Sequence, residues 1–72
     1  FGKSFYDFLN QYRIEHARNL LLKNDNHAIV NIAFAVGFNS NSAFYSAFKK
    51  YLGYMPAEYR KILKKIKYKL NK

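Results

Sequence analysis

Hydrophobic residues recur at intervals of three and four along most of this chain, which is the spacing of one face of an α-helix. The first such stretch lies between Ser4, a residue type favoured at helix N-caps, and Lys23, which suits a C-terminal turn. Its apolar positions are Phe5, Phe8, Leu9, Tyr12, Ala17, Leu20 and Leu21. The polar residues 24–27 then interrupt the pattern, so the sequence predicts a long helix over residues 4–23.

A second, shorter apolar stripe follows and ends at a glycine. Its members, spaced i, i+3, i+4 and i+7, are Ile29, Ile32, Ala33 and Val36. They predict a helix from about Ala28 to Val36 with one buried face. Gly37 stands where a left-handed C′ residue commonly ends a helix, so we expect the chain to turn there.

Two more helices are predicted in the second half of the chain. Residues 39–42 are rich in capping side chains and predict the start of a third helix, over about 41–52. Pro56 suits the first position of a fourth helix, over 56–70. The apolar stripe of that fourth helix comprises Tyr59, Ile62, Leu63, Ile66 and Leu70, and basic residues surround it.

No segment alternates with the period of two that strands require, so the fold class is predicted as all-α. We expect a small bundle of about four helices that contains one helix-turn-helix at residues 28–52. A chain of 72 residues makes one small domain, and its seven phenylalanines and seven tyrosines supply buried area in the absence of cysteine. Because it opens with Phe1 rather than methionine, residues 1–72 are interpreted as a single-domain fragment.

The charge balance narrows the class of partner. Thirteen Lys and Arg residues against four acidic residues give a net charge of +9. Such a charge attracts polyanions, above all nucleic acid and in some proteins an anionic membrane surface. No apolar run approaches the ~20 residues of a membrane span, and no signal-peptide pattern is present. We therefore expect no membrane partner and a cytoplasmic location.

The segment from Ile29 to Phe48 has the features of a helix-turn-helix. Such a motif needs a support helix, a tight turn and a second helix that crosses the first at roughly 90–120°. Ala33 is the small residue that a close crossing requires, Gly37 permits the turn, and Phe38 can fill the gap between the helices.

The outward side of the predicted third helix carries polar side chains. In the major groove, Asn pairs with adenine and Lys binds guanine, while N–H groups at a helix start can hold phosphate oxygens. The predicted base-facing residues are Asn41, Ser42, Tyr45 and Ser46, and the predicted phosphate-binding residues are Ser40, Lys49 and Lys50. The alternative is that these are ordinary capping and solvent-facing residues of a small bundle.

Three groups of residues at fixed spacings, in one order, cover the chain from its start to about residue 60. They are Gly2-x-x-Phe5-x-x-x-Leu9-x-x-x-Arg13-x-x-x-Ala17-x-x-Leu20-Leu21, Ile29-x-x-Ile32-Ala33-x-x-x-Gly37-Phe38 and Phe44-x-x-x-Phe48-Lys49-Lys50-x-x-Gly53-x-x-Pro56-x-x-Tyr59-Arg60. In these positions the chain resembles the C-terminal part of the DNA-binding domain of AraC/XylS-type bacterial transcription regulators.

The resemblance implies sequence-specific binding of double-stranded DNA, with the third helix in the major groove. It also implies that residues 4–23 join two helix-turn-helix motifs, of which this chain holds the second. RNA polymerase is a further expected partner through the parent protein. Two positions depart from the family pattern, and the basic tail after Arg60 is longer than many relatives carry. Met55 stands where relatives usually carry a Ser or Thr N-cap, and Ser46 stands where many place a large basic or polar reader.

Single residues and the basic tail allow other roles. Arg13 can contact phosphate or make a contact inside the domain, and its position in the family pattern, within an apolar stripe, favours the second. Neither His16 nor His27 has a third ligand nearby, and no nucleophile motif occurs, so we expect no metal, no cofactor and no enzymatic activity. The alternative function is a non-specific basic helical module that binds RNA or an anionic membrane surface through residues 60–72. Exposed apolar residues would also drive self-association in vitro.

Overall fold

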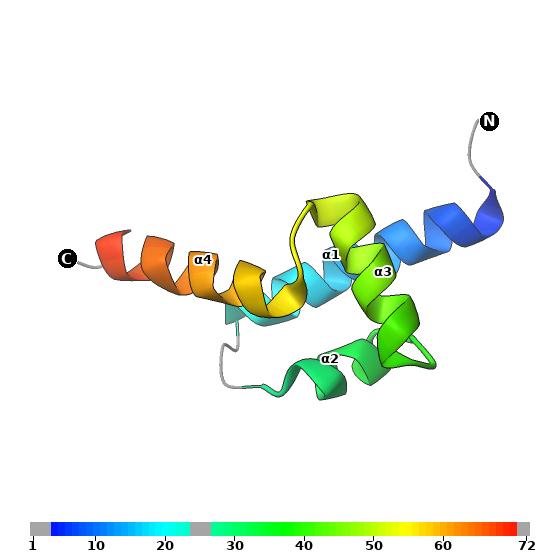
Figure 1. Ribbon diagram of the computed structural model, residues 1–72, viewed down its shortest axis with the longest axis horizontal. Helices are drawn as coiled ribbons and strands as arrows, with labels where there is room; N and C mark the ends of the chain where they lie inside the picture. The colour runs from blue at the N-terminus through cyan, green and yellow to red at the C-terminus, as the bar shows by residue number, and fades with distance from the viewer. Residues whose placement is uncertain (1–3, 24–26, 71–72) are drawn as a thin grey trace.

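The computed structural model describes residues 4–23 and 27–70. In chain order the helices are α1 (Phe5–Lys23), α2 (Ile29–Ala35), α3 (Asn41–Leu52) and α4 (Pro56–Leu70). Figure 1 shows α3 crossing α1 in the middle of the molecule, with α2 on one side and α4 leading away from it. The described residues contain no strand, and the all-α prediction is confirmed.

Local signals place the helix ends within a residue or two of the predicted positions. The Ser4 hydroxyl accepts a hydrogen bond from the Asp7 N–H at 3.1 Å and caps α1. In the same way, the Ser40 hydroxyl accepts from the Ala43 N–H at 3.2 Å and caps α3. Gly53 ends α3 with φ of +82°, and its N–H donates to the Lys49 carbonyl at 2.9 Å. That conformation suits glycine because it has no Cβ to clash.

The hydrophobic core is gathered around α3, which contacts each of the other three helices. The buried apolar residues are Ile14, Ala17, Leu21, Ile32, Ala33, Val36, Phe38, Phe44, Ala47 and Phe48. A line of edge-to-face aromatic contacts runs through this core. Ring centroids are 5.5 Å apart from Phe38 to Phe44, from Phe44 to Phe48, and from Phe48 to Tyr59 of α4. These rings join the α2–α3 turn to the last helix.

The apolar residues of α1 do not share one buried face, which corrects the stripe read from the sequence. Ala17 and Leu21 are buried as that stripe requires, but the third buried residue of the helix is Ile14, which the stripe omitted. Phe5, Phe8 and Tyr12 are 73%, 68% and 67% exposed. Tyr12 lies two residues before Ile14, which rotates it by roughly 200° around the helix. The helix therefore carries one apolar face toward the core and an aromatic face away from it.

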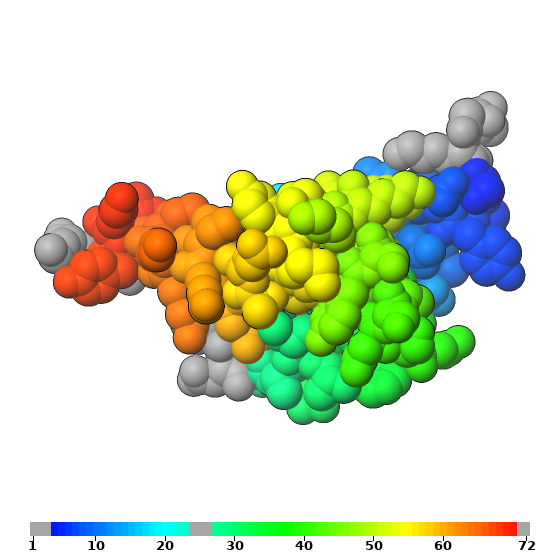
Figure 2. Space-filling view, viewed as in Figure 1, coloured from blue at the N-terminus to red at the C-terminus, as the bar shows by residue number. Residues whose placement is uncertain are grey.

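The fourth helix packs on the core through its first half only. Pro56 is fully buried, and Tyr59 and Leu63 pack against the core. Ile66 and Leu70, from the same predicted stripe, are exposed. Figures 1 and 2 show α4 (orange to red) and the start of α1 (blue) projecting at opposite ends. This projection explains an elongated shape of 44 × 25 × 16 Å.

Candidate nucleic-acid interface

The turn between α2 and α3 brings a supported helix to the surface. The Gly37 N–H donates to the Phe34 carbonyl at 3.1 Å, and the Phe38 N–H donates to the Ala33 carbonyl at 3.0 Å. Gly37 has φ of +107°, a conformation that favours glycine. Ala33 is completely buried, so α2 and the elements packed on it approach closely at this point. The segment thus has the support helix, glycine turn and second helix of a helix-turn-helix.

The second helix of this motif, α3, has an apolar inner face and a polar outer face. Phe44 and Phe48 are completely buried and hold the helix against the core. The exposed residues of α3 are Asn41, Ser42, Ala43, Ser46, Lys49 and Lys50. Figure 2 shows α3 (green to yellow-green) at the molecular surface, where a large partner can reach it. Short polar side chains and a lysine on a rigid, exposed helix are the groups that read base edges in the major groove.

The four predicted base-facing residues do not lie alike. The structure places Asn41, Ser42 and Ser46 at the surface, while Tyr45 is half-buried. The Tyr45 ring lies 5.9 Å from that of Phe44 and packs against the core. Ser42, Ser46 and Lys49 follow one another at spacings of four and three, which puts them on one face of the helix. This face is the centre of the candidate interface, with Tyr45 at its edge.

The predicted phosphate-binding residues lie at both ends of α3. Ser40 already accepts the capping hydrogen bond, but a hydroxyl that accepts one bond can still donate another to a phosphate oxygen. Lys49 and Lys50 are exposed at the other end. The Lys50 ammonium lies 3.6 Å from the Asp7 carboxylate of α1, so its charge is partly matched within the chain.

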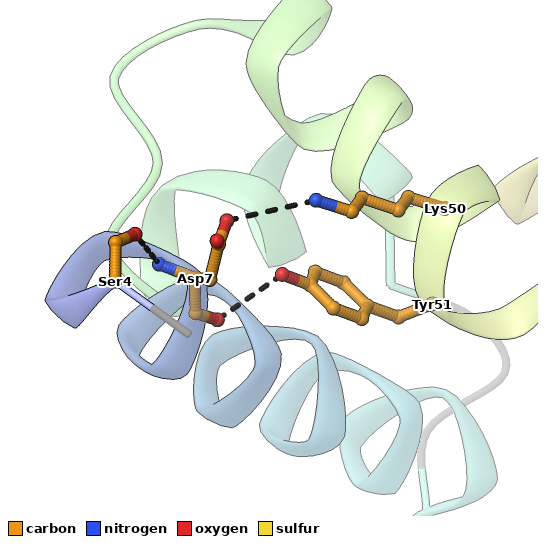
Figure 3. A network of polar contacts seen from close by, with 4 residues as sticks. All are labelled: Ser4, Asp7, Lys50 and Tyr51. Carbon is orange, nitrogen blue, oxygen red and sulfur yellow. Dashed lines mark hydrogen bonds and ion pairs between the residues drawn. The ribbon is translucent and has the colours of Figure 1, made fainter. Parts of the chain in front are cut away.

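Asp7 is the centre of a polar network that sequence reasoning missed. Figure 3 shows Ser4, Asp7, Lys50 and Tyr51 together at the junction of α1 and α3. In addition to the ion pair with Lys50, the Tyr51 hydroxyl donates to the Asp7 backbone carbonyl at 3.1 Å. Asp7 and Tyr51 are 44 positions apart, and no local spacing in the sequence points to their contact.

Two arginines that belong to the family-like sequence pattern make contacts inside the domain. The Arg13 guanidinium lies 5.6 Å from the centre of the Phe38 ring and donates to the Asn10 side-chain oxygen at 3.4 Å. Arg60 of α4 donates to the backbone carbonyl of His27, just before α2. The interpretation of Arg13 as an intradomain residue agrees with this placement.

Other kinds of site find no support in the described parts of the chain. Within residues 4–23 and 27–70, no three His, Cys, Asp or Glu side chains lie close enough together to hold a metal ion. Among these residues, too, no helix is both long and apolar enough to cross a membrane.

Comparison with known proteins agrees with this geometry. Residues 1–62 match the family model described as a helix-turn-helix domain. The chain is 46% identical over 55 residues to the melibiose operon regulatory protein of Escherichia coli K12, covering 76% of this chain and 18% of that protein. It is 40% identical over 60 residues to a putative AraC-like transcription regulator of Streptomyces lividans, covering 83% of this chain and 19% of that protein. It is 33% identical over 61 residues to a transcriptional regulatory protein of Bacillus subtilis, covering 83% of this chain and 17% of that protein.

These relatives are several times longer than the matched region, since the chain spans about a fifth of their length. No solved structure matches the chain. The family model ends at residue 62, so it includes the helix-turn-helix and leaves out most of the basic tail. The extent of this match does not favour the alternative in which residues 60–72 carry the function. The family consists of DNA-binding regulator domains and is not an enzyme family. The chain belongs to the AraC-type family of helix-turn-helix domains found in bacterial transcription regulators.

Proposed function

We propose that this chain binds double-stranded DNA in a sequence-specific manner, with α3 in the major groove, as part of a bacterial transcription regulator. One observation carries the proposal: α3 is held by two fully buried phenylalanines while Ser42, Ser46 and Lys49 remain exposed on one face. An anchored helix of this kind can enter the groove without rearranging the core. Membership of the helix-turn-helix family supports the same role.

We assign base contacts to Asn41, Ser42 and Ser46, with Tyr45 at the margin, where its exposed edge can meet a sugar or a thymine methyl. Phosphate contacts fall to the groups at the ends of α3, namely Ser40 with the N–H groups beside it, Lys49 and Lys50. Lys50 reaches a phosphate only by leaving Asp7. Such a role needs no cofactor and no catalysis, and it requires the compartment that holds DNA, the bacterial cytoplasm. Contact with RNA polymerase belongs to the complete regulator.

The affinity of this chain alone is expected to be modest. A single helix-turn-helix makes few phosphate contacts, so its dissociation constant should lie at about 10⁻⁴–10⁻⁶ M at physiological salt. Nanomolar, sequence-selective binding by the 72-residue chain would contradict this expectation.

An amide NMR titration of the isotope-labelled chain with a short random-sequence duplex at two salt concentrations tests the interface. We expect shifts centred on residues 40–49 that weaken as salt rises, because the contacts to phosphate displace counterions. Shifts confined to residues 60–70 would overturn the proposal and favour a polycationic tail.

A pair of lysine variants sharpens this test. Lys49→Ala should reduce the slope of log K against log salt by about 0.9, the value of one lost phosphate contact. Lys64→Ala removes the same charge from α4, outside the candidate interface, and should leave the slope nearly unchanged. Equal effects of the two substitutions would mean that only the net charge matters.

A further inference from the structure

The Arg13 side chain extends from α1 and contacts the turn that precedes α3, the candidate DNA-reading helix. A Cβ atom on residue 37 would lie only 2.9 Å from the Nε atom of Arg13, so the guanidinium rests directly against Gly37. The same guanidinium lies 5.6 Å from the centre of the Phe38 ring, within the range of a cation–π contact. Its Nη1 donates to the Asn10 side chain one turn earlier in α1, which fixes its direction.

Ring packing links Phe38, and with it the Arg13 contact, to α3. Phe38 is buried and meets Phe44 edge to face at 5.5 Å, and Phe44 meets Phe48 at the same distance. Phe44 lies in the first turn of α3, next to the exposed residues Asn41 and Ser42. Because packed cores have few alternative arrangements, a shift of Phe38 must move the start of α3 or leave a void.

We propose that Arg13 is a positioning residue for DNA recognition, which sets the orientation of α3 relative to α1 without touching DNA. The inference rests on the function proposed above and adds a residue outside the reading helix to it. The flat guanidinium suits this place because it can contact the bare backbone of Gly37 and the Phe38 ring at the same time. A lysine ammonium is a compact point charge and lacks that planar surface.

The first test uses the free chain, so that it does not depend on DNA. Residual dipolar couplings of backbone N–H groups report the direction of α3 relative to α1. Arg13→Gln should change the couplings of residues 41–52 relative to those of α1 and shift the amide signals of residues 37–40. Arg18→Gln is the matched control, because it removes the same charge from α1 and its guanidinium pairs with Glu15 within that helix.

The second test measures discrimination between DNA sequences. A duplex is selected from a random-sequence library by the unmodified chain, and its affinity is compared with that of a scrambled duplex. Arg13→Gln should lower this ratio roughly tenfold, the size of one lost base contact, while Arg18→Gln leaves it unchanged. The salt slope on the scrambled duplex should stay the same for Arg13→Gln, because no phosphate contact is lost. Arg13→Lys, which keeps the charge, should discriminate as poorly as Arg13→Gln, and it replaces that variant if Arg13→Gln does not fold.

Three results would overturn the proposal. One is a salt slope smaller by about 0.9 in Arg13→Gln, which would make Arg13 a phosphate contact. Another is a variant that unfolds more easily but, when folded, keeps its couplings and its discrimination, which would make Arg13 merely a stabilising residue. The third is full restoration by Arg13→Lys. If the unmodified chain shows no sequence preference, the proposed function fails. The couplings of the free chain then still decide whether Arg13 orients α3.

Discussion

At the scale of single residues, two glycines end helices with positive φ angles but in different surroundings. Gly37 has φ of +107°, and the Arg13 guanidinium fills the space where a side chain would begin. Gly53 has φ of +82°, and nothing lies within 4 Å of that space. Conformation therefore favours glycine at both positions, and at residue 37 a side chain would also meet the Arg13 guanidinium.

Alanine substitutions should separate these two requirements. Gly53→Ala should lower the free energy of unfolding by about 1–2 kcal/mol, the usual cost of a left-handed non-glycine residue. Gly37→Ala should cost more, because the new methyl group must also displace the Arg13 guanidinium from its contacts with Phe38 and Asn10. Urea denaturation monitored by circular dichroism measures both variants. Equal losses would show that the guanidinium moves aside freely.

The ion pair between Lys50 and Asp7 leads to a second residue-scale prediction. The Lys50 side chain is 63% exposed and that of Asp7 is 44% exposed, so solvent screens the pair and it is worth no more than about 1 kcal/mol. Asp7→Asn releases Lys50 and should raise the affinity for non-specific duplex by about two- to fivefold. Fluorescence anisotropy at low salt measures the change.

The control for this prediction removes the same negative charge elsewhere. Glu15→Gln changes the net charge by the same amount as Asp7→Asn but releases Arg18 of α1 instead of a lysine of α3. An equal rise in affinity for the two variants would mean that Lys50 does not reach the DNA.

At the scale of helices, the start of α4 has half of a capping box. The Glu58 carboxylate accepts a hydrogen bond from the Met55 N–H at 3.4 Å, but the Met55 side chain offers no acceptor in return. The carboxylate thus provides a partial substitute for the N-cap that Met55 lacks.

Completing that box should stabilise the chain. Met55→Ser gives the sequence Ser-Pro-Ala-Glu, in which the serine hydroxyl can accept from the Glu58 N–H. We expect the free energy of unfolding to rise by roughly 1 kcal/mol, measured by urea denaturation. Met55→Ala, which shortens the side chain without adding an acceptor, should bring no such gain. If the two variants are equally stable, the cap does not limit α4.

At the scale of the whole molecule, the aromatic face of α1 and the charge of +9 act in opposite directions. Exposed aromatic residues favour association between copies, whereas like charges on two copies repel each other. Salt shortens the range of that repulsion from about 10 Å at 0.1 M to about 3 Å at 1 M. The chain should therefore be monomeric at low salt and self-associate at high salt.

A lysine placed on that face should keep the chain monomeric. Phe8→Lys interrupts the aromatic face of α1 without opening the core, because Phe8 is 68% exposed. Phe34→Lys makes the same chemical change at an exposed position on α2 and should leave self-association intact. Sedimentation velocity at several salt concentrations compares the variants. Association that persists in Phe8→Lys would point to another surface, such as the exposed end of α4.

The positions of the helix ends could be predicted from the sequence because their signals are local. Ser4, Ser40, Gly37, Gly53 and Pro56 each act within three or four residues, through a capping hydrogen bond, a positive φ angle or a fixed φ angle. The outward face of α3 was predictable for a related reason, since its residues alternate with the buried Phe44 and Phe48 at helical spacing. The local signals at the helix ends and the helical spacing of the buried residues determine the fold class and the place of the candidate interface.

Only the tertiary structure decided which apolar face of α1 is buried, because Ile14 and Phe8 are both large apolar residues and the choice depends on where α2 and α3 pack. It also decided that Tyr45 lies half against the core. The contacts of Asp7 with Lys50 and Tyr51, and of Arg13 with Gly37 and Phe38, join residues far apart in the chain. Helical periodicity describes one element at a time, so it cannot predict contacts that form only when several helices meet.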